Sequence, residues 1–119
     1  MHPTLEKYRA AWEDRDPALL KTIFTPHAVY QFRPWEAARG LAEIEKYWLE
    51  KVVTQTDVCF EVTRELLVGN ELWIEWTAHA RLADRNTLRA LWGTMILELA
   101  NDNRISKLTE YYFKTEKPC

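Results

Sequence analysis

The chain has 119 residues, of which 47% are hydrophobic and 29% are charged, and its formal net charge is −2. This length predicts a single domain over residues 1–119, and no apolar run approaches the ~20 residues that a membrane helix needs. The 16 basic and 18 acidic residues are mixed along the chain. That distribution argues against nucleic acid as a partner, because duplex binding needs a clustered basic face.

The sequence predicts a cytoplasmic protein without a metal or a cofactor. Its N-terminus lacks the basic start and apolar core of a secretion signal. We interpret Cys59 and Cys119 as reduced thiols. The chain contains no CxxC motif and no paired histidines, so no metal site is predicted. It also shows no cofactor motif.

Two amphipathic helical stretches open the chain. Thr4 can cap the first helix, whose apolar stripe consists of Leu5, Tyr8, Ala11 and Trp12. Asp16 and Pro17 mark the start of a second, short helix, since Asp is a good cap and Pro suits the first helical position. Pro26 then prevents the helix from continuing.

An extended segment and a third helix follow. Residues 28–33 read as a strand that Pro34 ends, and residues 35–39 read as a loop. The third helix is expected over residues 41–52, after Gly40. Its apolar residues recur at helical spacing, and they are Leu41, Ile44, Trp48 and Val52.

Four strands are expected in the remainder of the chain. Residues 58–63 and 74–82 alternate between apolar and polar side chains, which is typical of half-buried strands. Residues 91–99 are apolar on both faces and are expected to be buried on both, and residues 105–113 form the last strand. Turn signals lie at 69–70, 84–86 and 101–103. By alternation His79 and Arg81 point away from the helices, although a one-residue bulge would turn them inward.

Helices first and strands last predict an α+β fold. The helices must cover one face of a curved antiparallel sheet, because each element has an apolar side to bury. In a chain of this size such an arrangement tends to enclose a pocket, and a pocket is the expected place for function.

Several segments carry a family resemblance. They are residues 8–16 (YRAAWEDRD), 24–30 (FTPHAVY), 34–35 (PW), 40–48 (GLAEIEKYW), and 104–105 with 110–113 (RI and EYYF). Together they resemble the NTF2-like superfamily, and most closely its SnoaL-like branch, whose members are relatives of ketosteroid isomerase. The resemblance implies an NTF2-like cone, with three N-terminal helices packed on a strongly curved, mostly antiparallel sheet that encloses a pocket. The superfamily includes enzymes and non-catalytic modules, so the fold alone is a weak guide to chemistry.

The catalytic residues of ketosteroid isomerase carry over at one position of three. In those enzymes a tyrosine and a protonated aspartic acid form the oxyanion hole, and a second aspartate moves the proton. The resemblance places the tyrosine at Tyr8 but the two acids at Phe32 and Met95, which cannot transfer protons. The Arg-x-Asp pair of related epoxide hydrolases is also missing, since Gly93 and Met95 stand there. We therefore expect no ketosteroid isomerase activity.

Glu110 and Tyr8 are the candidate catalytic residues. Strand alternation sets Glu110 on the same face as Leu108 and Tyr112, where burial would raise its pKa and make it an acid or base. Tyr8 would be the hydroxyl donor. Two alternatives stay open: Glu110 is a rim residue paired with an Arg or Lys, and Tyr8 is a core residue bonded to another side chain.

A set of aromatic and apolar residues is predicted to bind an apolar, partly oxygenated ligand. The alternative is that these side chains simply fill the interior. We also expect the pocket mouth near the 34–39 loop. The predicted ligand-binding residues are Trp12, Phe32, Trp35, Tyr47, Trp76, Met95, Leu97 and Tyr112.

Trp73, Trp92 and Ile96 fall on the face of the sheet opposite the helices. A monomer would expose them, and aromatic residues are enriched at interfaces. We predict a homodimer through this face; the alternative is that the C-terminal strand covers it. The functional hypothesis is a SnoaL-like pocket protein that performs acid/base chemistry on its ligand. The competing hypothesis is a non-catalytic binding or dimeric interaction module.

Overall fold

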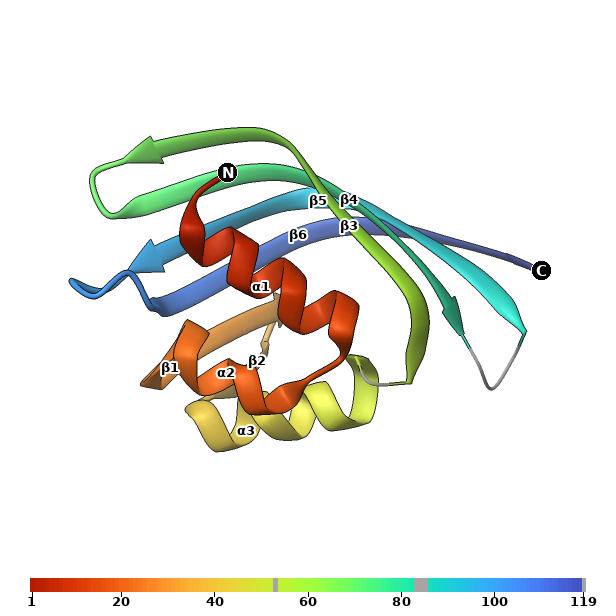
Figure 1. Cartoon of the computed structure of the whole chain (residues 1–119), viewed down its shortest axis with the longest axis horizontal. Helices are drawn as coiled ribbons and strands as arrows, with labels where there is room; N and C mark the ends of the chain where they lie inside the picture. The colour runs from red at the N-terminus through yellow and green to blue at the C-terminus, as the bar shows by residue number, and fades with distance from the viewer. Residues whose placement is uncertain (53, 83–85, 119) are drawn as a thin grey trace.

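The computed structural model describes residues 1–52, 54–82 and 86–118 (Figure 1). None of the helices in these ranges is long and apolar enough to cross a membrane. The elements are α1 (Pro3–Asp14), α2 (Leu20–Ile23), β1 (Phe24–Arg33), β2 (Glu36–Arg39), α3 (Leu41–Tyr47), β3 (Gln55–Val68), β4 (Glu71–Leu82), β5 (Thr87–Leu99) and β6 (Ile105–Pro118). A 3₁₀ turn over Pro17–Leu19 precedes α2, and a wide helical turn over Trp48–Val52 continues α3.

The strands form one six-stranded sheet in the order β2-β1-β6-β5-β4-β3. All neighbours are antiparallel except β1 and β6, which run parallel. The sheet is bent and open, and the three helices lie on its concave side (Figure 1). The predicted α+β fold, with helices on one face of a strongly curved and mostly antiparallel sheet, is confirmed.

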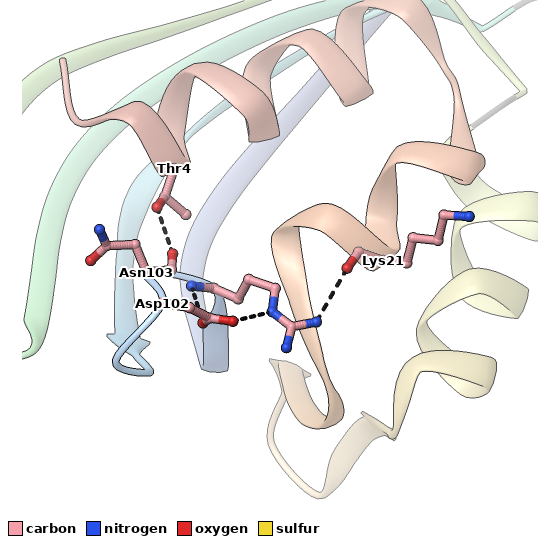
Figure 2. A network of polar contacts seen from close by, with 5 residues as sticks. Thr4, Lys21, Asp102 and Asn103 are labelled. Atoms are coloured by element: carbon pink, nitrogen blue, oxygen red, sulfur yellow. Dashed lines mark hydrogen bonds and ion pairs between the residues drawn. The ribbon is translucent and has the colours of Figure 1, made fainter.

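Helix α1 buries the predicted stripe of Leu5, Tyr8, Ala11 and Trp12, but Thr4 does not cap it. The cap is His2, whose Nδ1 accepts a hydrogen bond from the Thr4 backbone N–H at 3.1 Å. The Thr4 hydroxyl instead donates to the Asn103 carbonyl at 2.7 Å, as Figure 2 shows. Thr4 therefore ties the start of α1 to the β5–β6 turn.

A second contact ties α2 to the same turn. The Arg104 guanidinium group donates to the Asp102 carboxylate at 2.7 Å and to the Lys21 carbonyl at 3.5 Å (Figure 2). The predicted Asp16 cap of the preceding turn is confirmed, since its carboxylate accepts from the Ala18 N–H at 3.0 Å. The Thr4 and Arg104 contacts therefore tie two helices to the β5–β6 turn of the sheet.

The first strand and the loop after it differ from the prediction. β1 begins at Phe24, and residues 36–39, expected as a loop, form strand β2. β2 pairs with the edge of β1 and so satisfies backbone groups that a loop would leave to water. Trp35 makes the reversal with a φ of 63°. The third helix is also shorter than expected, because the regular helix ends at Tyr47 and a wider turn follows.

The long strands follow the predicted alternation. In β4 every second side chain from Leu72 to Leu82 is buried, and His79 is exposed on the opposite face, away from the helices, as predicted. β3 is longer than expected and carries two register shifts, between Thr56 and Cys59 and between Val62 and Arg64. Such bulges increase local twist and bend a strand, which fits the sharp curve of β3 in Figure 1.

The prediction that residues 91–99 are buried on both faces is wrong. Met95, Leu97 and Leu99 are buried, but Trp92 is 63% exposed. The helices cover only the concave face, so the outer face of β5 remains open in a single chain. Of the predicted turn at 84–86, residues 84 and 85 lie outside the described residues, as does Cys119.

Candidate functional site

A cavity of about 160 Å³ lies between the helices and the concave face of the sheet. Helices α1 and α3, the turn after α3 and strands β1, β3, β4, β5 and β6 each contribute side chains to it. The lining consists of Tyr8, Trp12, Tyr30, Arg33, Tyr47, Trp48, Lys51, Val52, Gln55, Trp76, Arg89, Leu91, Glu110, Tyr112 and Lys114. Both candidate catalytic residues, Glu110 and Tyr8, therefore reach the same cavity.

Glu110 comes from β6 and is held by Tyr30 of β1. The Tyr30 hydroxyl donates a hydrogen bond to the Glu110 carboxyl oxygen Oε1. Tyr30 is also within hydrogen-bonding reach of the Tyr8 and Tyr47 hydroxyls. One carboxyl group and three phenol groups thus form a cluster, which we call the Glu110–tyrosine cluster: Tyr8, Tyr30, Tyr47 and Glu110.

Burial governs the protonation of this cluster. Loss of solvent raises the pKa of Glu110 to about 7, although the hydrogen bond from Tyr30 acts in the opposite direction. Burial, followed by the charge of Glu110, raises the pKa of Tyr8 and Tyr30 well above the ordinary value. The phenols are therefore protonated donors at neutral pH, whereas Glu110 can both hold and release a proton.

Glu110 does not take part in any of the ion pairs found among the described residues. Its side chain is only partly accessible, and its hydrogen-bond partner is a phenol. The alternative of a rim glutamate paired with an Arg or Lys does not match this geometry. The alternative for Tyr8, a buried tyrosine bonded to another side chain, does match its neighbourhood with Tyr30.

Aromatic rings build the walls. Tyr8 makes edge contacts with Trp12 and Trp48, at centroid separations of 6.2 and 6.1 Å. Trp76 lies 6.4 Å from Tyr112 across the sheet side of the cavity. The Trp12 indole N–H donates to Gln55 Oε1 at 2.8 Å, which leaves the face of its ring available as a wall.

Four of the eight predicted ligand-binding residues line the cavity, namely Trp12, Tyr47, Trp76 and Tyr112. The other four do not. Trp35 is fully exposed, because it lies in the short turn between the paired strands β1 and β2. Met95 and Leu97 are fully buried in the core. Phe32 packs against Tyr47, with ring centroids 4.4 Å apart, and borders the outer groove described below.

Sequence reasoning missed Tyr30, Trp48 and Gln55 as lining residues, and also the basic residues at the cavity. Tyr30 could have been predicted to face the interior, because it lies two residues after Ala28 on β1 and therefore on the same, buried face of the strand. The basic residues gave no signal, because they come from four separate elements. They are Arg33, Lys51, Arg89 and Lys114.

The outer face of the sheet carries exposed aromatic residues. Trp92 and Phe113 are cross-strand partners and are 63% and 78% exposed, and Tyr111 is 61% exposed. A groove of about 840 Å³ runs over this face. The predicted interface residues Trp73 and Ile96 are also paired here, and Trp73 is 43% exposed. We refer to Trp73, Trp92, Tyr111 and Phe113 as the outer aromatic patch.

Comparison with protein families gives one decisive match. The model of the SnoaL-like domain matches residues 5–108 of this chain. The chain belongs to the SnoaL-like domain family. The resemblance drawn from the sequence is thereby confirmed. A comparison with curated protein sequences gave no match.

Solved structures similar to this SnoaL-like chain share its fold at low identity. A protein with a ketosteroid isomerase-like fold from Catenulispora acidiphila, in complex with trimethylamine, is 19% identical, with a TM-score of 0.81 over 92% of this chain and 85% of that one. A putative polyketide cyclase from Sinorhizobium meliloti is 16% identical, with a TM-score of 0.75 over 93% and 95%. The Δ5-3-ketosteroid isomerase from a Mycobacterium species is 9% identical, with a TM-score of 0.84 over 96% and 95%.

These similarities establish the SnoaL-like fold and its relation to the ketosteroid isomerase fold. At such identities they carry no catalytic residue across to this chain. The groups in the cavity that can carry chemistry are those of the Glu110–tyrosine cluster.

Proposed function

We propose that this SnoaL-like domain binds a small, apolar, oxygenated molecule in the cavity and transfers a proton to or from it through Glu110. The observation that carries the proposal is a carboxyl group that lines the cavity and is held there by Tyr30; its burial raises the pKa of Glu110 to about 7. A group with a pKa near the working pH is the most effective acid or base, because both of its protonation states are populated.

The surroundings of Glu110 support a division of roles. The carboxyl group removes a proton from a carbon or oxygen of the ligand, or returns one. Tyr8, held among three aromatic rings, presents a phenol that stays protonated at neutral pH. Such a donor can stabilise negative charge that develops on a ligand oxygen. Tyr30 positions Glu110 through its hydrogen bond.

The small molecules bound by similar folds also favour a ligand in the cavity. The Catenulispora structure contains trimethylamine, and a computationally designed 17-OHP binder shares 12% identity with this chain at a TM-score of 0.86. Here the aromatic walls provide apolar contact area, and the cluster provides a few convergent polar groups. This combination is typical of small-molecule sites.

The test is proton exchange into a simple ketone. Cyclohexanone is incubated with the protein in D₂O, and loss of its α-proton signals is followed by NMR. We expect exchange above the buffer rate, abolished in Glu110→Gln. Tyr8→Phe should keep binding but slow exchange by roughly 10²-fold, since one transition-state hydrogen bond is lost. Exchange that is unchanged in Glu110→Gln would contradict the assignment of the base.

The second candidate function is a non-catalytic binding module, and the two missing ketosteroid isomerase acids favour it. Phe32 and Met95 occupy those positions, so Glu110 has no second carboxyl group to assist it. If ring compounds bind to the wild type and to Glu110→Gln with equal affinity, and neither protein catalyses exchange, the binding module is the correct assignment.

We further propose that the protein is a homodimer through the outer aromatic patch. Exposed aromatic residues lie together on one face of the sheet, over a groove that a second copy could fill. Contiguous apolar surface of this kind marks association sites. The groove and the cavity share Arg33, Glu110, Tyr112 and Lys114 in their linings, so a second copy in the groove would lie next to the cavity.

A further inference from the structure

We propose that the cavity takes a single-ring organic anion, with the ring among the aromatic walls and its carboxylate beside Lys51 and Lys114 at the open end. This inference rests on the proposed binding function; it specifies the apolar part of the ligand as one ring and its oxygenated part as a carboxylate. It is carried by the distribution of charge and exposure among the residues that line the cavity.

The exposed residues of the lining are all cations. Of the 15 residues around the cavity, Arg33, Lys51 and Lys114 are the exposed ones, and the others are buried or half-buried. Exposed members of a lining mark its open end. A ligand that enters must therefore pass three positive charges before it reaches the aromatic walls.

Two of these cations have no carboxylate partner in the part of the chain that the structure describes. Arg33 lies 3.8 Å from the Glu36 carboxylate, and the half-buried Arg89 is paired with Glu116 at 2.8 Å. Lys51 and Lys114 form no ion pair within the described residues. They come from different layers, the turn after α3 and strand β6, so they approach the opening from the helix side and the sheet side.

Aromatic walls could also suit a cationic ligand, because ring faces attract positive charge. In this cavity, however, the three cations at the open end would repel a cationic ligand. Among the described residues, Glu110 is the single carboxyl group in the lining; burial raises its pKa to about 7, and it already accepts a hydrogen bond from Tyr30. The balance of charge therefore favours an anion, whose head group stays at the opening and away from Glu110.

The cavity volume limits the ligand to one ring. A volume of about 160 Å³ is close to the roughly 150 Å³ that holds a benzene molecule in an engineered protein cavity. An arylacetate matches this space: its ring fills the cavity, and its methylene group carries the carboxylate toward the lysines.

The experiment compares three probes that share one ring and differ in charge: phenylacetate, phenylacetamide and 2-phenylethylamine. Affinities are measured by calorimetry at neutral pH and low salt. We expect phenylacetate to bind about tenfold more tightly than phenylacetamide, and the ammonium compound to bind most weakly. Raising the salt from about 0.05 to about 0.5 M should reduce the preference for the anion.

Lysine variants test whether the preference for phenylacetate over phenylacetamide arises at the open end of the cavity. Lys51→Gln and Lys114→Gln should each lower phenylacetate affinity about threefold, with little effect on the amide. Lys107→Gln makes the same charge change on β6 at a residue outside the lining, and it should change neither affinity.

The outcomes separate the two proposals. Equal binding of the acid and the amide, or tighter binding of the ammonium compound, overturns the anion inference but leaves the binding function intact. An effect of Lys107→Gln as large as that of Lys114→Gln assigns the preference to overall charge and overturns the site. Absence of binding by all three probes overturns both the inference and the proposed binding function.

Discussion

Tyr30 donates a hydrogen bond to Glu110, although 80 positions separate the two residues in the sequence. The parallel pairing of β1 with β6 brings them together. Tyr30 is the register partner of Leu108, and Glu110 lies two residues further along β6 on the same face. This one parallel pair in an otherwise antiparallel sheet creates the Glu110–tyrosine cluster.

The Tyr30→Phe variant should raise the pKa of Glu110 above about 7. The Tyr30 hydrogen bond lowers that pKa, whereas burial raises it, so removal of the bond leaves burial unopposed. Carbon NMR titration of the labelled glutamate carboxyl groups measures the shift. Tyr8→Phe serves as the control and should move the pKa less, because Tyr30 is the phenol that donates to Glu110. A wild-type pKa at the ordinary 4.5 would contradict the burial of the carboxyl group.

Stability should fall as the pH rises from 4.5 to 7, owing to Glu110. The unfolded chain releases this proton near pH 4.5, whereas the folded state holds it to about pH 7. Between these values the folded state binds more protons, so the free energy of unfolding decreases with pH. The loss amounts to roughly 3 kcal/mol at most.

The Glu110→Gln variant isolates this effect, because an amide does not titrate. Denaturant unfolding of both proteins is compared at pH 5 and pH 8. We expect the free energy of unfolding of Glu110→Gln, relative to that of the wild type, to be higher at pH 8 than at pH 5. A difference between the two proteins that does not change with pH would show that Glu110 titrates alike in the folded and unfolded states.

The Gly93→Ala variant should be destabilised by about 1–3 kcal/mol, which is typical of overpacking. A Cβ at Gly93 would collide with the Tyr111 carbonyl oxygen and come within 2.8 Å of the Tyr112 Cβ, so the backbone of β5 or β6 would have to move. Thermal or denaturant unfolding measures the loss. Thr94→Ala on the same strand is the control, and its effect should stay within about 0.5 kcal/mol.

The Trp92→Glu variant should be monomeric if the outer aromatic patch forms the dimer interface. Trp92 is 63% exposed in one chain, and a glutamate there would bury an unpaired charge against the second copy. Sedimentation velocity reads the oligomeric state. Leu49→Glu, at an exposed apolar residue on the helix side, should leave the dimer intact. If the wild type is monomeric at a protein concentration of tens of micromolar, on the order of the Kd of weak complexes, the dimer proposal is wrong.

No isomerisation of a 5-en-3-one steroid should be detected. Phe32 and Met95 cannot move a proton, and Met95 is fully buried in the core. A cavity of about 160 Å³ also fits one ring and not four fused rings. The assay follows the conjugated enone by absorbance. Turnover that disappears in Tyr8→Phe would contradict this prediction.

The sequence by itself determined the fold and the orientation of most strand residues. Side-chain alternation has a period of two, so the buried face of β4 and the placement of Glu110 beside Leu108 and Tyr112 followed from local pattern. The stripe of α1, which carries Tyr8 and Trp12 into the cavity, followed in the same way from helical spacing.

The tertiary structure alone decided which of these residues meet. The partner of Glu110 depends on the register of a parallel strand pair 80 positions apart, which no local pattern encodes. The exposure of Trp35 depends on a reversal at positive φ that pairs β2 with β1. The cationic opening depends on Arg33, Lys51 and Lys114 converging from three elements. Local pattern fixes the face on which a side chain lies, whereas long-range packing fixes what stands opposite it.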